Sequence, residues 1–76
     1  MKDFVVYVAR ALVDQPDEIV VTEVVGRQSS ILELRCHPQD FGRLIGRSGK
    51  TIGALRTLVS SLALRQSRRA ILEVAE

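Results

Sequence analysis

Two glycines three residues apart bracket a short polar stretch in the middle of the chain, within the octet Leu44–Thr51, LIGRSGKT. Glycine tolerates positive φ and has no Cβ, so a ligand can come close to a loop built on Gly46 and Gly49. The cations Arg47 and Lys50 flank this pair, and a helix beginning near Lys50 would add free N–H groups and the positive end of its dipole. Amide donors, a dipole and cations together favour an anionic ligand such as phosphate.

The charge of the chain is unevenly distributed around this loop. Residues 1–40 carry four basic and seven acidic side chains, a net charge of −3. Residues 41–72 carry seven basic side chains and no acidic one, a net charge of +7. A stretch of this length without a carboxylate favours a surface that meets a polyanion. A solvated basic face with no partner is the alternative that charge alone leaves open.

The first half of the chain predicts one helix and two strands. The apolar side chains Phe4, Val5, Val8, Ala9 and Leu12 follow helical spacing and predict a helix over residues 2–13. The stripe of Phe4, Val5, Val8 and Leu12 is expected to face the core, and an exposed part of it could serve dimerisation. The β-branched run 18–25 predicts a strand, and residues 26–29 predict a hairpin turn. Residues 30–37 alternate between apolar and polar, which predicts a second, antiparallel strand that buries Leu32, Leu34 and Cys36.

The second half predicts two helices around the loop and a last strand. Asp40 stands where the N-cap of a short helix over residues 41–45 belongs. After the loop, a longer helix carries one apolar stripe, formed by Ile52, Leu55, Val59 and Leu62. Residues 70–74 predict a strand. The order α-β-β-α-α-β predicts an α+β fold in which three helices cover one face of a three-stranded sheet. The short chain is expected to form one domain over residues 1–76.

Three interpretations compete for the loop. A nucleotide-binding P-loop would need glycine where Leu44 stands, and no strand runs directly into the loop. The dinucleotide-binding fingerprint fails because Gly42, Gly46 and Gly49 have the wrong spacing. A simple corner between two helices, with glycines that only make the turn, stays open. It does not by itself account for the flanking cations and the long stretch without acidic residues.

The third interpretation is a KH module, whose G-x-x-G loop clamps the backbone of single-stranded nucleic acid. Residues 44–52, LIGRSGKTI, resemble the I-G-x-x-G core of these modules, and the element order resembles their type II arrangement. More narrowly, residues 40–46 and 51–57 are similar to the segments that flank the loop in the KhpA family of small bacterial RNA-binding proteins. The resemblance covers essentially the whole chain and implies a type II KH fold. Gln39 and Gly53 are its minor departures.

The resemblance also implies a function. A single KH domain of this family would bind single-stranded RNA in the cytoplasm, as an RNA chaperone or post-transcriptional regulator. The residues that the resemblance assigns to RNA binding are Arg43, Ile45, Gly46, Arg47, Ser48, Gly49, Lys50, Thr51 and Ile52. The bases are expected in a groove between the two helices and the sheet, over Ile45 and Ile52. Single-stranded DNA stays open as a ligand.

Partners follow from the same resemblance. Family members of this kind are thought to pair, either as a homodimer or as a heterodimer with a larger KH protein called KhpB, Jag or EloR. The alternative function is therefore a protein-interaction or dimerisation subunit whose RNA contact is incidental. Arg65, Arg68 and Arg69 either extend the nucleic-acid surface or cap the long helix, and the sequence favours neither.

Other chemistry finds little support in the residues. Cys36 is expected to be a buried small side chain, and His37 to lie at the surface on the opposite face of the strand. The chain has one cysteine and one histidine, too few for a metal site built on these ligands. No serine has a recognisable histidine base, and no apolar run is long enough to cross a bilayer. We therefore expect no catalysis, cofactor, metal or membrane contact.

Overall fold

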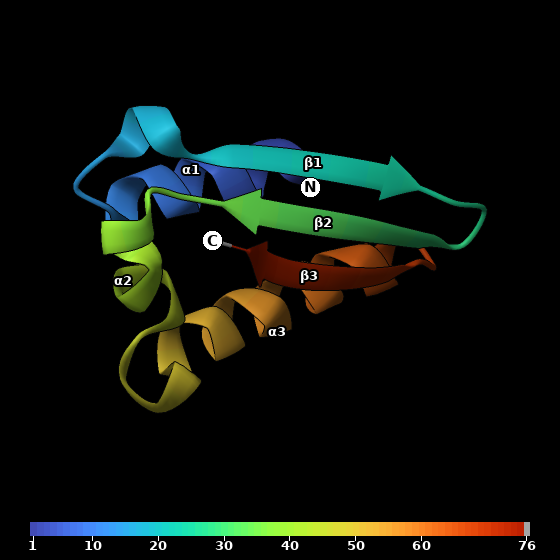
Figure 1. Cartoon of the computed structure of the whole chain (residues 1–76). Coiled ribbons are helices and arrows are strands. Elements are labelled where there is room, and N and C mark those ends of the chain that lie inside the picture. Colours follow the sequence, from blue (N-terminus) through green and yellow to red (C-terminus); the bar gives the residue numbers. More distant parts are fainter. Residues whose placement is uncertain (76) are drawn as a thin grey trace.

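The computed structural model describes residues 1–75, and its element order is the predicted α-β-β-α-α-β (Figure 1). The helices and strands are α1 (Lys2–Leu12), β1 (Val20–Val25), β2 (Ser29–Arg35), α2 (Phe41–Ile45), α3 (Lys50–Arg65) and β3 (Arg69–Ala75). Short 3₁₀ turns lie in three of the connections, at Pro16–Glu18, Pro38–Asp40 and Arg47–Gly49.

The sheet is mixed, with strand order β1-β2-β3. β1 and β2 are antiparallel, as the hairpin predicted, with Val21 opposite Leu34. β2 and β3 are parallel, with Leu32 opposite Leu72. Because parallel strands need a crossover connection, α2, the loop and α3 all lie between β2 and β3 in the chain. α3 therefore leads from the loop to the start of β3 and packs beside that strand (Figure 1).

One face of the sheet packs against the helices. In β2 and just after it, the alternate residues Ser30, Leu32, Leu34 and Cys36 are buried, as the period of two predicted. From the helices, the core takes Val5 and Ala9 of α1, Leu44 of α2, and Ile52, Leu55, Val59 and Ala63 of α3. Phe4 and Val8 pack against this core while partly exposed, whereas Leu12, in the last turn of α1, is 37% exposed.

The apolar stripe of α3 ends one residue later than predicted. Leu62 is 37% exposed, and Ala63 is fully buried in its place. Ala63 lies eleven positions after Ile52, which is close to three turns of a helix with 3.6 residues per turn, so these two side chains share a face. Leu62 is rotated away from that face.

The strand limits also differ from the predicted ones. β1 begins at Val20 and not at residue 18, because Pro16–Glu18 forms a 3₁₀ turn in which Ile19 N donates to Pro16 O at 3.2 Å. β2 ends at Arg35, two residues before the predicted end, and the chain turns at Pro38–Asp40. β3 is one residue longer at each end than predicted.

Candidate nucleic-acid interface

The G-x-x-G loop joins α2 to α3 and contains three residues with positive φ. These are Gly46 at 76°, Ser48 at 56° and Gly49 at 74°. A Cβ added to Gly46 would overlap the Thr51 side chain and lie 2.8 Å from the Thr51 backbone nitrogen. A Cβ on Gly49 would meet nothing within 4 Å. Gly46 is therefore required by packing as well as by its φ, whereas the space over Gly49 is open to a ligand.

The loop closes on itself and leaves amide donors available. Gly46 N donates to Gly42 O at 2.8 Å, and Gly49 N donates to Gly46 O at 3.1 Å. Within residues 1–75, neither the Arg47 N–H nor the Ser48 N–H donates to a backbone carbonyl in a turn, loop or helix cap. Successive free amides in a turn with a left-handed residue form a concave, positively polarised arrangement that suits an anion.

The cations of the loop are unpaired in the described part of the chain. The Arg47 and Lys50 side chains are exposed, and neither makes an ion pair with any residue from 1 to 75. Lys50 is also the first residue of α3, so the amide donors, the helix dipole and two cations meet at one place, as the sequence predicted. This arrangement can bind a phosphate group.

Arg43, also predicted to bind RNA, already has partners. Its Nη2 lies 3.1 Å from Asp14 Oδ2, and its Nε lies 3.9 Å from Asp40 Oδ1. The Arg43 side chain is still 57% exposed, so the pair with Asp14 is a surface ion pair that solvent screens. An RNA phosphate at this position would have to compete with the Asp14 carboxylate.

Asp40 stands immediately before α2, as predicted, but its side chain makes no N-cap hydrogen bond. The carboxylate is buried and accepts hydrogen bonds from Asp14 N at 3.2 Å and from Gln15 N at 3.1 Å. The turn after α1 is thereby tied to the start of α2, and through α2 to the loop. The sequence could not indicate these partners, because they lie 25 and 26 residues away from Asp40.

A groove lies between α3 and β3, which run side by side (Figure 1). It consists of two adjoining hollows of about 340 and 230 Å³ that share Ser60, Ala70 and Ile71. Its other lining residues are Arg56, Leu64, Arg68, Arg69, Leu72 and Glu73. Because α3 starts at the loop, the loop and the α3–β3 groove lie along the same helix.

The apolar part of the groove differs from the predicted one. Ile52 is 4% exposed and belongs to the core, and the half-buried Ile45 packs against that core. Apolar surface in the groove comes mainly from Ala70 and Ile71 of β3 and from Leu64 of α3. These residues were not predicted from the sequence, although an apolar strand that follows the long helix was the available signal. No aromatic residue is among those that line the groove.

The structure separates the three arginines that the sequence left undecided. Arg65 is exposed in the last turn of α3 and does not line the groove. Arg69 is exposed and lines it. Arg68 also lines the groove, but its guanidinium donates to carbonyl oxygens of the β1–β2 turn and of Ser29, the first residue of β2.

The remaining candidate residues have structural roles. Cys36 is 7% exposed, as expected. His37, expected at the surface of the strand, is instead half-buried beyond the end of β2, where its Nδ1 accepts from Gln39 N at 3.1 Å. Within residues 1–75, no cluster of three or more His, Cys, Asp or Glu side chains could hold a metal ion. No helix of this part combines the length and the apolar character needed to span a membrane.

Comparison with known proteins identifies the family. Residues 2–74 match the family model described as KhpA/KhpB, KH domain. The chain belongs to the KhpA/KhpB KH-domain family. Its mixed three-stranded sheet and α-β-β-α-α-β order agree with the predicted KH fold. No solved structure matches the chain.

Several full-length relatives from the KhpA side of the family are similar to this chain. The protein of Caldanaerobacter subterraneus is 45% identical over 74 residues, which is 97% of this chain and 99% of the relative. That of Clostridium acetobutylicum is 42% identical with the same coverage, and that of Chlamydia caviae is 43% identical over 76 residues, or 100% and 97% of the two chains. Each is named RNA-binding protein KhpA, a name that describes binding and no enzymatic reaction.

Proposed function

We propose that this chain binds single-stranded RNA, with the G-x-x-G loop gripping the RNA backbone and the bases lying along the α3–β3 groove. The observation that supports this most directly is the pair of available amides at Arg47 and Ser48, beside the unpaired cations Arg47 and Lys50. Relatives named for RNA binding cover the whole chain and add independent support. The whole of residues 1–76 would act as a single KH domain.

Each part of the loop has a place in this mechanism. Gly46 and Gly49 shape the turn and allow the RNA backbone to come close, and the Arg47 and Ser48 amides donate to phosphate oxygens. Arg47 and Lys50 add Coulomb attraction, and Thr51 fills the space that Gly46 leaves. Without an aromatic stacking platform in the groove, we expect loosely selective binding, with a Kd in the micromolar range for one domain, roughly as for non-specific complexes.

A small domain with this kind of binding suits an RNA chaperone or a post-transcriptional regulator in the cytoplasm better than a reader of one defined sequence. It would act by holding single-stranded segments, and no cofactor or catalytic group takes part. Single-stranded DNA offers the same phosphates, so a DNA oligonucleotide of matched sequence belongs in every binding experiment.

The test is the fluorescence anisotropy of a labelled, mixed-sequence single-stranded RNA titrated with the protein. In the double variant Arg47→Asp, Ser48→Asp, two carboxylates stand where the phosphate should bind. Aspartate tolerates the left-handed conformation of residue 48 better than most residues do, so the variant is expected to fold. We expect binding to be lost while the circular dichroism spectrum stays unchanged.

A matched control keeps the change in net charge but moves it away from the loop. Lys2→Glu, Thr22→Glu also alters the charge by −3, at exposed positions on α1 and β1 that do not line the groove. We expect this control to bind RNA nearly as tightly as the unmodified protein. Equal binding by the loop variant and the control would refute the loop mechanism.

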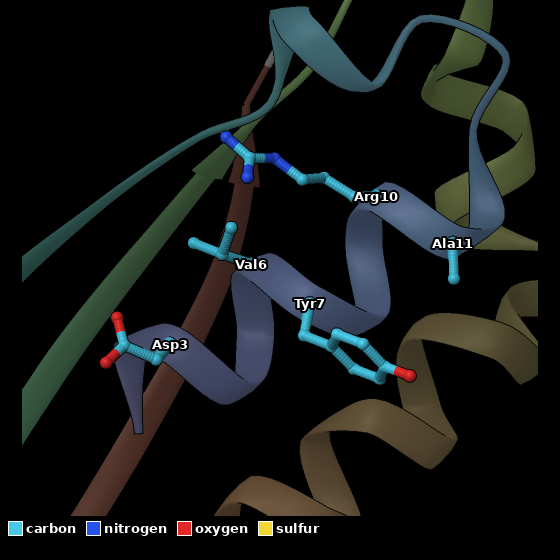
Figure 2. A pocket seen from close by; sticks show the side chains of 5 residues that line it. All are labelled: Asp3, Val6, Tyr7, Arg10 and Ala11. Carbon is cyan, nitrogen blue, oxygen red and sulfur yellow. The ribbon is translucent and has the colours of Figure 1, made fainter.

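A second candidate function, protein interaction, is favoured by the outer face of α1. A hollow of about 470 Å³ lies there, lined by Asp3, Val6, Tyr7, Arg10 and Ala11. Figure 2 shows these five side chains along α1. The Tyr7 side chain is 76% exposed, and Asp3 and Arg10 stand seven residues apart on one face of the helix. An antiparallel α1 of a second KH domain would place each Asp3 near the partner's Arg10. We propose this face for pairing, as a homodimer or with a larger KH protein of the KhpB type.

A charge swap tests the pairing. We expect Asp3→Arg and Arg10→Glu each to shift the chain toward the monomer in sedimentation velocity, and the double variant to restore the dimer. If neither single variant changes the sedimentation coefficient, this face of α1 is not the interface. RNA binding by the loop does not depend on that result.

A further inference from the structure

Arg68 stands at the junction of three elements at the far end of the α3–β3 groove. Its backbone N–H donates to Ala63 O at 2.9 Å and so helps to end α3. The next residue, Arg69, begins β3, and its N–H donates to Gln28 O in the β1–β2 turn at 2.8 Å. The position of Arg68 therefore decides where β3 starts relative to α3, which are the two walls of the groove.

The Arg68 side chain donates hydrogen bonds to the β1–β2 turn and to the first two residues of β2. Its Nη1 donates to Arg27 O at 3.0 Å. Its Nη2 lies 3.0 Å from Gly26 O, 2.9 Å from Ser29 O and 3.0 Å from the buried Ser30 Oγ. Only a planar guanidinium presents several donors in a fixed fork that can reach acceptors on four of the five residues from Gly26 to Ser30, whereas an ammonium group is a compact point charge.

We propose that Arg68 is a positioning residue of the RNA-binding groove, which holds the start of β3 against the β1–β2 turn and does not itself contact phosphate. The inference rests on the proposed function in one respect, since it takes the α3–β3 groove as the path of the RNA. Arg69, exposed and lining the same end of the groove, is left as the cation that meets the RNA backbone there.

The two arginines are distinguished by charge-conserving and charge-removing variants. Arg68→Lys keeps the charge, but the ammonium group cannot donate to all four acceptors of the Arg68 side chain. We therefore expect RNA affinity to fall about threefold or more, with the salt dependence unchanged. Arg69→Gln removes a phosphate contact, so we expect the slope of log K against log salt to fall by about 0.7. If Arg68 contacted phosphate itself, Arg68→Lys would bind like the unmodified protein, and that result would overturn the proposal.

Amide hydrogen exchange of the RNA-free protein gives a readout that does not depend on RNA. In Arg68→Lys we expect the Arg69 N–H, which bonds to Gln28 O, to exchange at least about tenfold faster. Val21→Ala, a core change in β1 away from the groove, controls for general destabilisation and should bind RNA normally. Unchanged exchange at Arg69 would contradict the inference. If Arg68→Lys does not fold, Ser30→Ala removes one of the four acceptors, and the same faster exchange is expected.

The outcomes separate this inference from the proposed function. If the Arg47→Asp, Ser48→Asp variant still binds RNA, the proposed function fails, whatever Arg68 does. If that variant loses binding while Arg68→Lys behaves like the unmodified protein in affinity and exchange, only the role of Arg68 is refuted.

Discussion

Arg43 and Asp14 form an ion pair, with Arg43 Nη2 3.1 Å from Asp14 Oδ2, at the point where the turn after α1 meets α2. Arg43 stands three residues before Gly46. The ion pair with Asp14 therefore competes with any contact between the Arg43 guanidinium and RNA bound at the loop. Both side chains are more than half exposed, and such pairs contribute about 0.2–1 kcal/mol.

Asp14→Asn is therefore expected to tighten RNA binding about two- to fivefold, because Arg43 is released. The Asp14 backbone N–H keeps its bond to Asp40, so the fold is not disturbed. In an Arg43→Gln background the same change should have no effect, and anisotropy titrations of the four proteins form a double-mutant cycle. Asp17→Asn, an exposed carboxylate in the same turn, is the control; an equal gain there would indicate only a long-range charge effect.

Asp40→Asn should destabilise the fold. The carboxylate is 2% exposed and accepts from two backbone N–H groups, and asparagine would turn its amide donors toward one of them. We expect the free energy of unfolding in urea to fall by about 2–3 kcal/mol. Asp17→Asn should shift it by less than about 0.5 kcal/mol. A comparably small loss for Asp40→Asn would mean that the turn after α1 does not depend on this carboxylate.

The two loop glycines should respond differently to alanine. Gly46→Ala meets both an unfavourable φ and the overlap with Thr51, so we expect a loss of about 3 kcal/mol or more in urea unfolding. Gly49→Ala meets only the unfavourable φ, and we expect about 1–2 kcal/mol. Equal losses would show that the contact with Thr51 relaxes without cost.

Gly53→Ala should stabilise the protein while weakening RNA binding. Gly53 is exposed in α3, and a Cβ there would meet nothing within 4 Å, so helix propensity alone predicts a gain of about 1 kcal/mol. Gly53 lies on the helix face of Arg56 and Ser60, which line the groove. We expect the added methyl group to reduce affinity about threefold, measured by anisotropy. Unchanged affinity would place the RNA away from this part of α3.

Ser67→Gly should also raise stability. Ser67 has a φ of 57° just after α3, where its N–H donates to Leu64 O and the Arg68 N–H donates to Ala63 O. This is a Schellman ending, in which glycine is the preferred residue at the left-handed position. We expect the thermal or urea midpoint to rise by the equivalent of about 1 kcal/mol. A decrease would mean that the serine side chain makes a contribution that its backbone geometry does not reveal.

Local periodicity was enough to predict the order of the elements. The alternation of Leu32, Leu34 and Cys36 marked β2, and the spacing of Ile52, Leu55 and Val59 marked the buried face of α3. The G-x-x-G loop could be predicted equally well, because positive φ at Gly46 and Gly49 is a local requirement that few other residues meet. The prediction was wrong at Leu62, because its smaller neighbour Ala63 takes the buried position in the last turns of α3.

The order of the helices and strands, the loop and the family resemblance could therefore be predicted, since each depends on residues within a few positions of one another. Which charged groups are available depends instead on contacts between residues that lie far apart in the chain. In the folded chain, Arg43 forms an ion pair with Asp14, and the buried Asp40 carboxylate accepts from the turn after α1. The Arg68 guanidinium donates to carbonyl oxygens 39 to 42 residues away. The groove between α3 and β3 also forms only in the folded chain. Such contacts depend on how the elements pack, and one-dimensional spacing carries no information about that packing.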